Sequence, residues 1–236
     1  MDYYYARKPE SMSDVFKQMI ISLKNKQGYL NFIADEKEMD KILFNFNPKS
    51  VFETYREDWK KLFDKFAEKF KSRYKMDINN KRNAWVMYSK GVLSGAKFLS
   101  NFNSVREFDK FVKSFFHDEF TIAALPMLLE KEIFGFGFPL ACDFLKELGY
   151  VQYAKPDIHL KDIFLELGLV GSKSDYEVFK KIVKMSKLVN KDPVIVDKIF
   201  WLIGSGNFYE SGIKIGRQKV KFIDHMKKKL DGRTYQ

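Results

Sequence analysis

The sequence predicts an all-α fold, and three observations lead to this prediction. Apolar residues recur every three or four positions along most of the 236 residues. No stretch of useful length alternates apolar and polar residues, as a half-buried strand would. Ser, Asp or Asn, which commonly begin helices, precede several of the apolar stretches. The chain is long enough to bury a core in one domain or in two closely packed lobes.

The first part of the chain is predicted to form two helices. Ser13 and Asp14 are expected to begin a helix whose apolar residues continue to Leu23. Asn47-Pro48 interrupts the chain, and a single amphipathic helix is predicted from there to Tyr74. Its apolar stripe is rich in aromatic residues and consists of Phe52, Tyr55, Trp59, Leu62, Phe63, Phe66 and Phe70. The lysines on its other face are explained by solvent exposure without invoking a ligand.

Further helices are predicted over 83–99, from about residue 104, and over 120–127. Residues 128–148 are predicted to form two helices joined by a tight turn. The first helix should end near Ile133, and the second should run from about Phe138 to Leu148. Helices over 157–167, 174–188, 194–203 and 212–230 complete the chain, each beginning or ending at Ser, Asp, Pro or Gly. We find no internal repeat.

Composition limits the possible functions. The chain has 42 basic and 31 acidic residues, a net charge of +11, which suits a polyanionic partner but also occurs in proteins that bind no nucleic acid. A single cysteine, Cys142, excludes an internal disulfide and a four-cysteine metal site, and we expect a buried structural thiol. No apolar run is long enough to cross a membrane, and no signal peptide is evident, so we expect a cytoplasmic protein.

The most informative segment is the turn at Gly135-Phe136-Gly137 and the sequence that follows it. Glycines at a helix start let the backbone approach a phosphate and offer it amide donors. Further along, Pro156 and Asp157 begin the next predicted helix, and His159 follows two residues later. An aspartate at such a place is a candidate catalytic carboxylate, and equally a candidate helix N-cap.

Together these residues resemble the helix-hairpin-helix DNA glycosylases. In that family an aspartate follows the hairpin at about the distance that separates Pro139 from Asp157, which is 157 − 139 = 18 residues. A histidine two residues past the aspartate is also common there, and His159 matches it. The resemblance covers 121–168 specifically and 80–206 more loosely. It implies two helical lobes with an active-site cleft between them. It also implies a glycosylase core at 81–206 with its hairpin at 128–148, an N-terminal helical extension at 1–80, and a basic C-terminal helix at 207–236.

The resemblance also implies roles for particular residues. Asp157 would stabilise the positive charge that develops on the sugar and position the attacking water. Backbone amides of Gly135, Gly137 and Leu140 would bind a DNA phosphate, and His159 would contact another. Its structural alternative is a packed, hydrogen-bonded histidine.

Two further roles concern a bound ion and the extruded base. Carbonyls of Ile133 and Phe136 would hold a structural Na⁺ or K⁺, as the hairpin often does in the family. The base would enter a pocket for which Trp85, Tyr88 and Phe138 are the candidates, although aromatic residues at helical spacing are more often core.

The sequence departs from the family at one important position. Members that also cleave the strand carry a lysine where this chain has Pro139, and proline cannot form a Schiff base. The resemblance therefore implies a monofunctional enzyme that uses water as its nucleophile. Weak strand cleavage would require another lysine, such as Lys155 or Lys131. The iron–sulfur cluster of some members is excluded by the single cysteine, and no cofactor is required.

Three functions remain open on the sequence, all with double-stranded DNA as the partner. The first is base excision repair of a damaged or mismatched base. The second is a sequence-specific, restriction-type glycosylase that removes a normal base. The third is a non-catalytic DNA-binding module that keeps the hairpin alone. A carboxylate such as Asp157 would repel DNA phosphates, and this favours an enzyme over a binding module.

Overall fold

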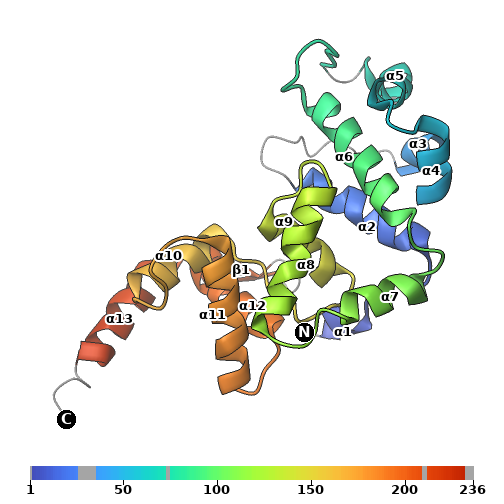
Figure 1. The fold of residues 1–236 in the computed structure, drawn as a ribbon. Coiled ribbons are helices and arrows are strands. Elements are labelled where there is room, and N and C mark those ends of the chain that lie inside the picture. The colour runs from blue at the N-terminus through green and yellow to red at the C-terminus, as the bar shows by residue number, and fades with distance from the viewer. Residues whose placement is uncertain (1, 26–35, 73–74, 209–211, 232–236) are drawn as a thin grey trace.

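The computed structural model describes residues 2–25, 36–72, 75–208 and 212–231, and they form an all-α fold, as predicted (Figure 1). The helices of the first half are α1 (Asp2–Ala6), α2 (Met12–Lys24), α3 (Glu36–Ile42), α4 (Pro48–Tyr55), α5 (Trp59–Phe70), α6 (Ala84–Leu99) and α7 (Val105–Lys113). Those of the second half are α8 (Glu119–Glu132), α9 (Phe138–Glu147), α10 (Ile158–Glu166), α11 (Asp175–Leu188), α12 (Pro193–Ser205) and α13 (Lys219–Asp231). Two short antiparallel strands, β1 (Asn207–Phe208) and β2 (Ile213–Lys214), lie between α12 and α13. No described helix has both the length and the apolar character needed to cross a membrane.

Buried apolar side chains gather in two main clusters. The larger one joins α2 to α9 and takes in Phe179 and Val183 from α11. The smaller one lies among α10, α11, α12 and α13, which form the lower left part of the molecule in Figure 1. The larger cluster includes residues on both sides of position 80, so the N-terminal segment shares a core with α6, α8 and α9. α11 contributes to both clusters and connects the two parts.

Several element boundaries differ from the predictions. The helix predicted from Asn47 to Tyr74 is two helices, because Arg56 adopts a left-handed backbone (φ 48°) after α4, and Asp58 then caps α5. Residues 73–74 lie outside the described part of the chain. The first long helix is capped two residues earlier than expected, since Ser11 forms a capping box with Asp14. α13 begins at Lys219 rather than near residue 212.

The turn between α8 and α9 is fixed against α6. It closes with a hydrogen bond from the Phe136 amide to the Ile133 carbonyl at 3.0 Å, and Gly135 takes a left-handed conformation (φ 91°) that favours glycine. The Phe134 amide donates to the Ser94 hydroxyl of α6 at 2.8 Å. Gly91, one turn earlier on α6, leaves room for the Phe134 carbonyl.

Gly91→Ala is expected to destabilise the protein by about 1–3 kcal/mol, because the new Cβ would lie 2.8 Å from the Phe134 carbonyl oxygen and 3.1 Å from Leu23. That oxygen belongs to the backbone of the turn, so the turn itself would have to shift. Gly171→Ala is the matched control, since a Cβ at that position would meet no atom within 4 Å. Urea unfolding of both variants measures the effect. Equal urea midpoints for the two variants would show that contact with α6 does not fix the position of the turn.

Candidate functional site

Asp157 is the N-cap of α10. Its Oδ1 accepts hydrogen bonds from the backbone amides of His159 at 2.8 Å and Leu160 at 3.0 Å, as an N-cap aspartate commonly does. The side chain is half-buried. Among the described residues no donor contacts its Oδ2. One carboxylate oxygen therefore fixes the side chain, while the other is available to a ligand.

A cavity of about 480 Å³ lies beside Asp157. It is lined by residues of α1, α2, α9 and α12 and of the loop that precedes α10. α2 and α9 contribute to the larger apolar cluster, and α12 contributes to the smaller cluster. Its lining residues are Tyr3, Arg7, Gln18, Ile21, Asn25, Asp143, Lys146, Glu147, Lys155, Asp157, Asp197, Lys198 and Trp201. Its size is within the usual range for small-molecule sites.

The wall formed by α9 carries a buried ion pair. Lys146 Nζ lies 2.9 Å from Asp143 Oδ1, and these two residues are only 2% and 6% exposed. Lys155 approaches the same oxygen at 3.5 Å. Burial tends to raise the pKa of Asp143, but the neighbouring charges of Lys146, Lys155 and Lys198 outweigh it and lower this pKa to about 2. Asp143 is therefore ionised at neutral pH.

A second buried carboxylate, Asp197 of α12, supports the loop that carries Asp157. Its Oδ2 accepts a hydrogen bond from the Lys155 amide at 3.0 Å. The Asp157 amide in turn donates to the Lys155 carbonyl at 2.8 Å. Burial raises the pKa of Asp197, against the opposing effect of Lys146 and Lys198. The position of Asp157 is thus set from two sides, by its own helix and by α12.

The charges of the cavity balance, and its aromatic residues come from α1 and α12, which are far apart in sequence. Four basic residues, Arg7, Lys146, Lys155 and Lys198, face four acidic ones, Asp143, Glu147, Asp157 and Asp197. Trp201 of α12 is half-buried, and the Lys198 ammonium lies 5.5 Å from its ring centre. Tyr3 lies beneath the Arg7 guanidinium at 4.0 Å. A neutral, partly aromatic ligand with a charged edge fits these surroundings.

The hairpin amides are partly available to an anion. Among the described residues, the N–H groups of Gly135, Gly137 and Phe138 donate to no acceptor, and they precede or begin α9. The Leu140 amide, predicted to bind phosphate with those of Gly135 and Gly137, donates instead to the Gly137 carbonyl at 2.9 Å. The Phe138 amide is the third one without an acceptor, because the first turn of a helix leaves such amides without intrahelical partners.

The predicted monovalent cation site involves carbonyls that the turn partly uses. The Ile133 carbonyl accepts the Phe136 amide, which leaves it one further lone pair. Ile133 and Phe136 have hydrocarbon side chains, so only their backbone carbonyls could bind a cation. No group of three or more His, Cys, Asp or Glu residues suited to a metal ion occurs in the described ranges.

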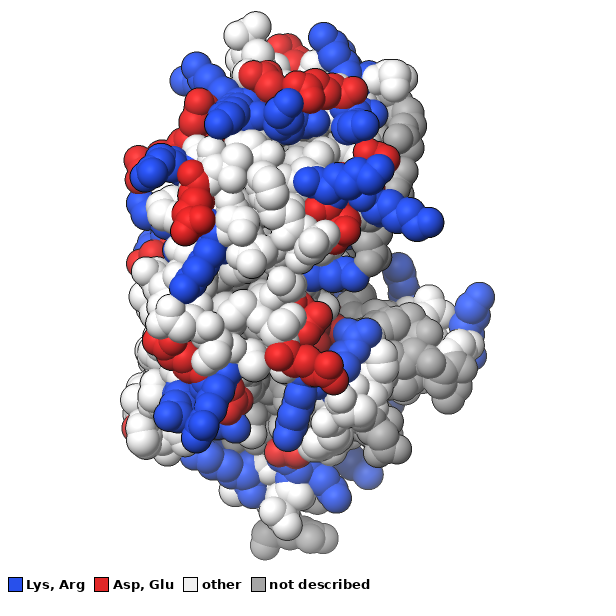
Figure 2. All heavy atoms as spheres, turned by 90° about the vertical axis from the view of Figure 1, so that its right-hand side faces the viewer, with Lys and Arg blue, Asp and Glu red and all other residues white. Residues whose placement is uncertain are grey.

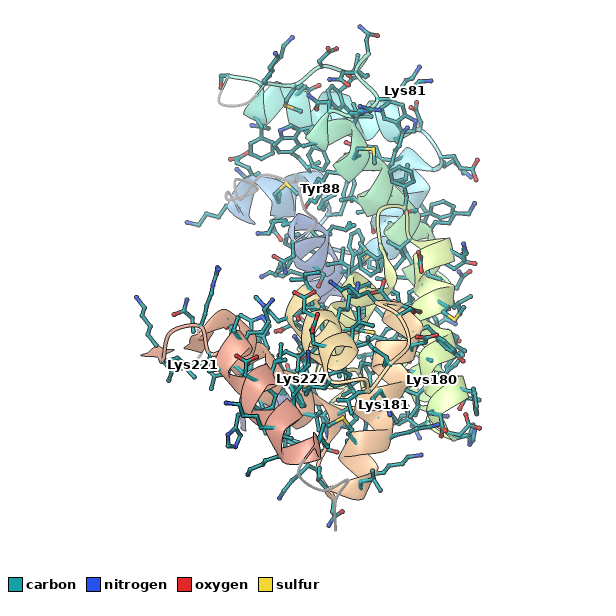
Figure 3. All side chains as sticks on the ribbon, turned by 90° about the vertical axis from the view of Figure 1, so that its left-hand side faces the viewer. Lys81, Tyr88, Lys180, Lys181, Lys221 and Lys227 are labelled. Carbon is teal, nitrogen blue, oxygen red and sulfur yellow. The ribbon has the colours of Figure 1, made fainter. Side chains whose placement is uncertain are left out.

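Three predicted base-pocket residues are core residues, which corrects that part of the prediction. Trp85 and Tyr88 are each 1% exposed and pack with Phe66 and Phe70 of α5, Trp85 stacking on Phe70 at 5.2 Å. Figure 3 shows Tyr88 among side chains packed around α6. Phe138 is 5% exposed and packs edge-to-face on Phe179 of α11. Their burial leaves no surface on which a base could stack.

His159, predicted to contact a phosphate, lies in the first turn of α10 and packs against α12. Its ring packs so closely on Gly204 of α12 that a Cβ there would lie 2.4 Å from the Cβ of His159. Its Nδ1 is buried and has no hydrogen-bond partner among the described residues. The close packing agrees with the structural alternative, whereas the hydrogen bond expected of that alternative is not made by Nδ1 within the described residues. A phosphate contact by the half-buried His159 stays a prediction.

The cysteine behaves as expected. Cys142 is fully buried on α9, and burial raises the pKa of its thiol well above the ordinary value. This confirms the expected buried thiol.

Sequence reasoning missed most of the cavity lining. Trp201, which lies on an apolar stripe of its helix, lines the cavity and was not among the predicted site residues. Asp143 and Lys146 offered a usable signal, because an oppositely charged pair three residues apart interrupts an otherwise apolar helix. Of the two lysines named as possible amines for strand cleavage, Lys155 lines the cavity, whereas Lys131 is an exposed residue at the end of α8.

The net positive charge is not concentrated on one continuous surface in the view of Figure 2. Basic and acidic side chains alternate there around a central area of uncharged residues. On α13, Lys219 and Lys227 pair with Asp162 and Glu166 of α10 at 2.7 and 2.9 Å. Part of the basic C-terminal helix therefore has acidic partners within the protein.

Comparisons with known proteins identify no relative. No family model, no curated protein and no solved structure matches this chain. The functional conclusion therefore depends on the residues of the site.

Proposed function

We propose that the chain is a monofunctional DNA glycosylase that hydrolyses the bond between a flipped-out base and its sugar. One observation carries the proposal. Asp157, which the resemblance to helix-hairpin-helix glycosylases singles out, lines a cavity large enough for a nucleotide, with one oxygen fixed and the other available. The helical hairpin formed by α8 and α9 also supports a glycosylase, because it offers free amides to a phosphate.

The chemistry follows from the arrangement of these groups. When the bond between base and sugar breaks, positive charge develops at the anomeric carbon, and the ionised Asp157 stabilises it. A water molecule then attacks that carbon, and Asp157 Oδ2 accepts its proton. The base leaves with the bonding electrons and takes up a proton from solvent water, while Asp157 releases to solvent the proton that it accepted. Asp197 and the α10 amides hold the carboxylate in place during these steps.

The base needs a surface to stack on, because extruding a nucleotide from the duplex costs a few kcal/mol. We assign this role to Trp201 in place of Trp85 and Tyr88. It is the half-buried aromatic residue that shares the cavity with Asp157. The balanced charge of the lining suits an uncharged base.

The proposal is tested by measuring base release from a panel of duplexes, with undamaged genomic DNA included. Each reaction is analysed with and without alkaline cleavage of abasic sites. Strand breaks that appear only after alkali are expected, and the duplex that responds separates repair of a damaged or mismatched base from restriction of a normal one. Salt-sensitive binding without release from any duplex would instead identify a non-catalytic DNA-binding module.

Strand cleavage without alkali is expected to be weak and to depend on Lys155. This is the lysine of the cavity with the most exposed side chain, 31%, whereas Lys146 and Lys198 are buried. A Schiff base requires an uncharged amine that can reach the sugar. Borohydride trapping of the Schiff base on abasic DNA measures this activity, and Lys131→Met is the control outside the cavity. Efficient trapping by the wild-type protein would contradict the monofunctional assignment.

A further inference from the structure

A second, smaller cavity of about 230 Å³ lies beside the hairpin turn. It is formed by the start of α5, by α6 and by the turn itself. Its walls are mainly apolar, and the residues that matter for its chemistry are Arg56, Trp59, Lys90, Leu93, Lys97 and Phe134. This cavity shares no lining residue with the Asp157 cavity, and the roles predicted for the hairpin amides and carbonyls do not involve it.

Two aromatic rings in this cavity flank a lysine. Lys90 Nζ lies 4.6 Å from the centre of the Trp59 ring and 5.6 Å from that of Phe134. Phe134 is 41% exposed, yet its backbone is fixed by the hydrogen bond to Ser94. Trp59 is half-buried at the first turn of α5. The protein therefore presents two rings on fixed backbone, separated by a flexible cationic side chain.

The rim of this cavity is basic. Arg56, Lys90 and Lys97 supply three positive charges, and Glu57, paired with Lys97 at 2.8 Å, supplies the one negative charge among the lining residues. The cavity thus combines aromatic surface with an excess of positive charge. Proteins that bind single-stranded nucleic acid use this combination, with bases on the rings and phosphates on the cations.

We propose that this cavity binds one unpaired nucleobase of a DNA strand that crosses the hairpin turn. The base stacks on Trp59 and Phe134, and Lys90 leaves the rings to contact a neighbouring phosphate. Stacking of a base on an aromatic ring is stronger than an exposed cation–π contact, which favours the exchange.

The position of the site explains how a strand would reach it. Phe134 directly precedes Gly135, and the free amides of Gly135 and Gly137 are the candidate phosphate donors of the turn. A strand held by those amides brings an adjacent nucleotide close to the Phe134 ring. The inference rests on the proposed function only because it requires a DNA strand at the turn. It requires no chemistry at Asp157.

The test is binding of a fluorescein-labelled dT12 single strand, followed by anisotropy at low salt. Trp59→Ala and Phe134→Ala are each expected to weaken binding by about tenfold or more. Phe120→Ala is the matched control. It removes a 57% exposed phenylalanine that also lies under a lysine, Lys180 at 4.9 Å, at the opposite end of α8. Binding by this control should equal that of the wild type. Circular dichroism verifies that all variants remain helical.

A second measurement addresses the lysine. Lys90→Met keeps the length of the side chain and removes its charge, so the slope of log affinity against log salt should fall by about 0.7, the value for one phosphate contact on a single strand.

Wild-type affinity in both aromatic variants, or no binding by the wild type, overturns the proposal. A dimer of the wild type that Trp59→Ala dissociates without changing dT12 affinity would assign the cavity to a second copy of the chain. Base release from duplexes is measured separately, so failure of the nucleobase site can be distinguished from failure of the proposed glycosylase activity.

Discussion

Asp157→Asn is expected to reduce base release by at least about a hundredfold while leaving DNA binding intact or stronger. Asparagine caps a helix about as well as aspartate, so the hydrogen bonds to the amides of His159 and Leu160 can be kept. The substitution therefore removes the negative charge from the cavity without removing the cap. Loss of a negative charge near phosphates should also favour binding.

Single-turnover base release and anisotropy on the same duplex measure the two effects. Asp157→Ala is the informative comparison, because it removes both the charge and the cap and should cost about 1 kcal/mol of stability. If Asp157→Asn lost binding and activity in parallel, Asp157 would be a structural cap and the catalytic assignment would be wrong.

Lys146→Met is expected to destabilise the folded protein by about 3–5 kcal/mol, a large part of the stability of a typical domain. Methionine fills a similar volume, but the substitution removes the cation closest to the buried Asp143 carboxylate. Lys155 remains, at 3.5 Å from that carboxylate. Removing one member of a buried ion pair costs more than replacing both. The double variant Asp143→Leu with Lys146→Met should therefore recover much of the lost stability. Urea unfolding at pH 7 measures all three proteins, and a Lys146→Met variant as stable as the wild type would show that the pair is solvated.

The same pair predicts a pH dependence of stability. The pKa of Asp143 is about 2 in the folded protein, below its ordinary value of 3.8, so the unfolded chain takes up this proton first as pH falls. Its contribution, about 2 kcal/mol, is complete above pH 4 and is lost between about pH 4 and pH 2. Asp143→Asn should flatten the decline of the unfolding free energy over that interval.

Local sequence signals predicted the elements around the site well. The end of the first hairpin helix near Ile133 and the start of the second at Phe138 agree with α8 and α9. The beginning of α10 after Asp157 also agrees. These boundaries depend on glycine, proline and capping residues, whose effects on the backbone are local. By contrast, the break at Arg56 contains neither glycine nor proline, and its local signal is the capping residue Asp58, which the apolar stripe continuing on both sides of it outweighed.

The lining of the cavity could not be predicted, because it depends on which helices meet. Trp85 and Trp201 both lie on apolar stripes, and periodicity shows that such residues face inward without showing what they face. Only the packing of α5 on α6 buries Trp85, and only the approach of α12 to α9 exposes Trp201 to the cavity. Buried charges such as Asp197 are equally hidden, since their partners are far away in sequence.

The cavity brings together residues that are far apart in sequence, Tyr3 and Arg7 with Lys198 and Trp201. Tyr4, beside them, packs with Val151 and Val194. During synthesis α1 therefore gains these partners only after residues 151–201 have left the ribosome. Contacts so distant in sequence make folding slow, and a chain that stops short of α12 would lack one wall of the cavity.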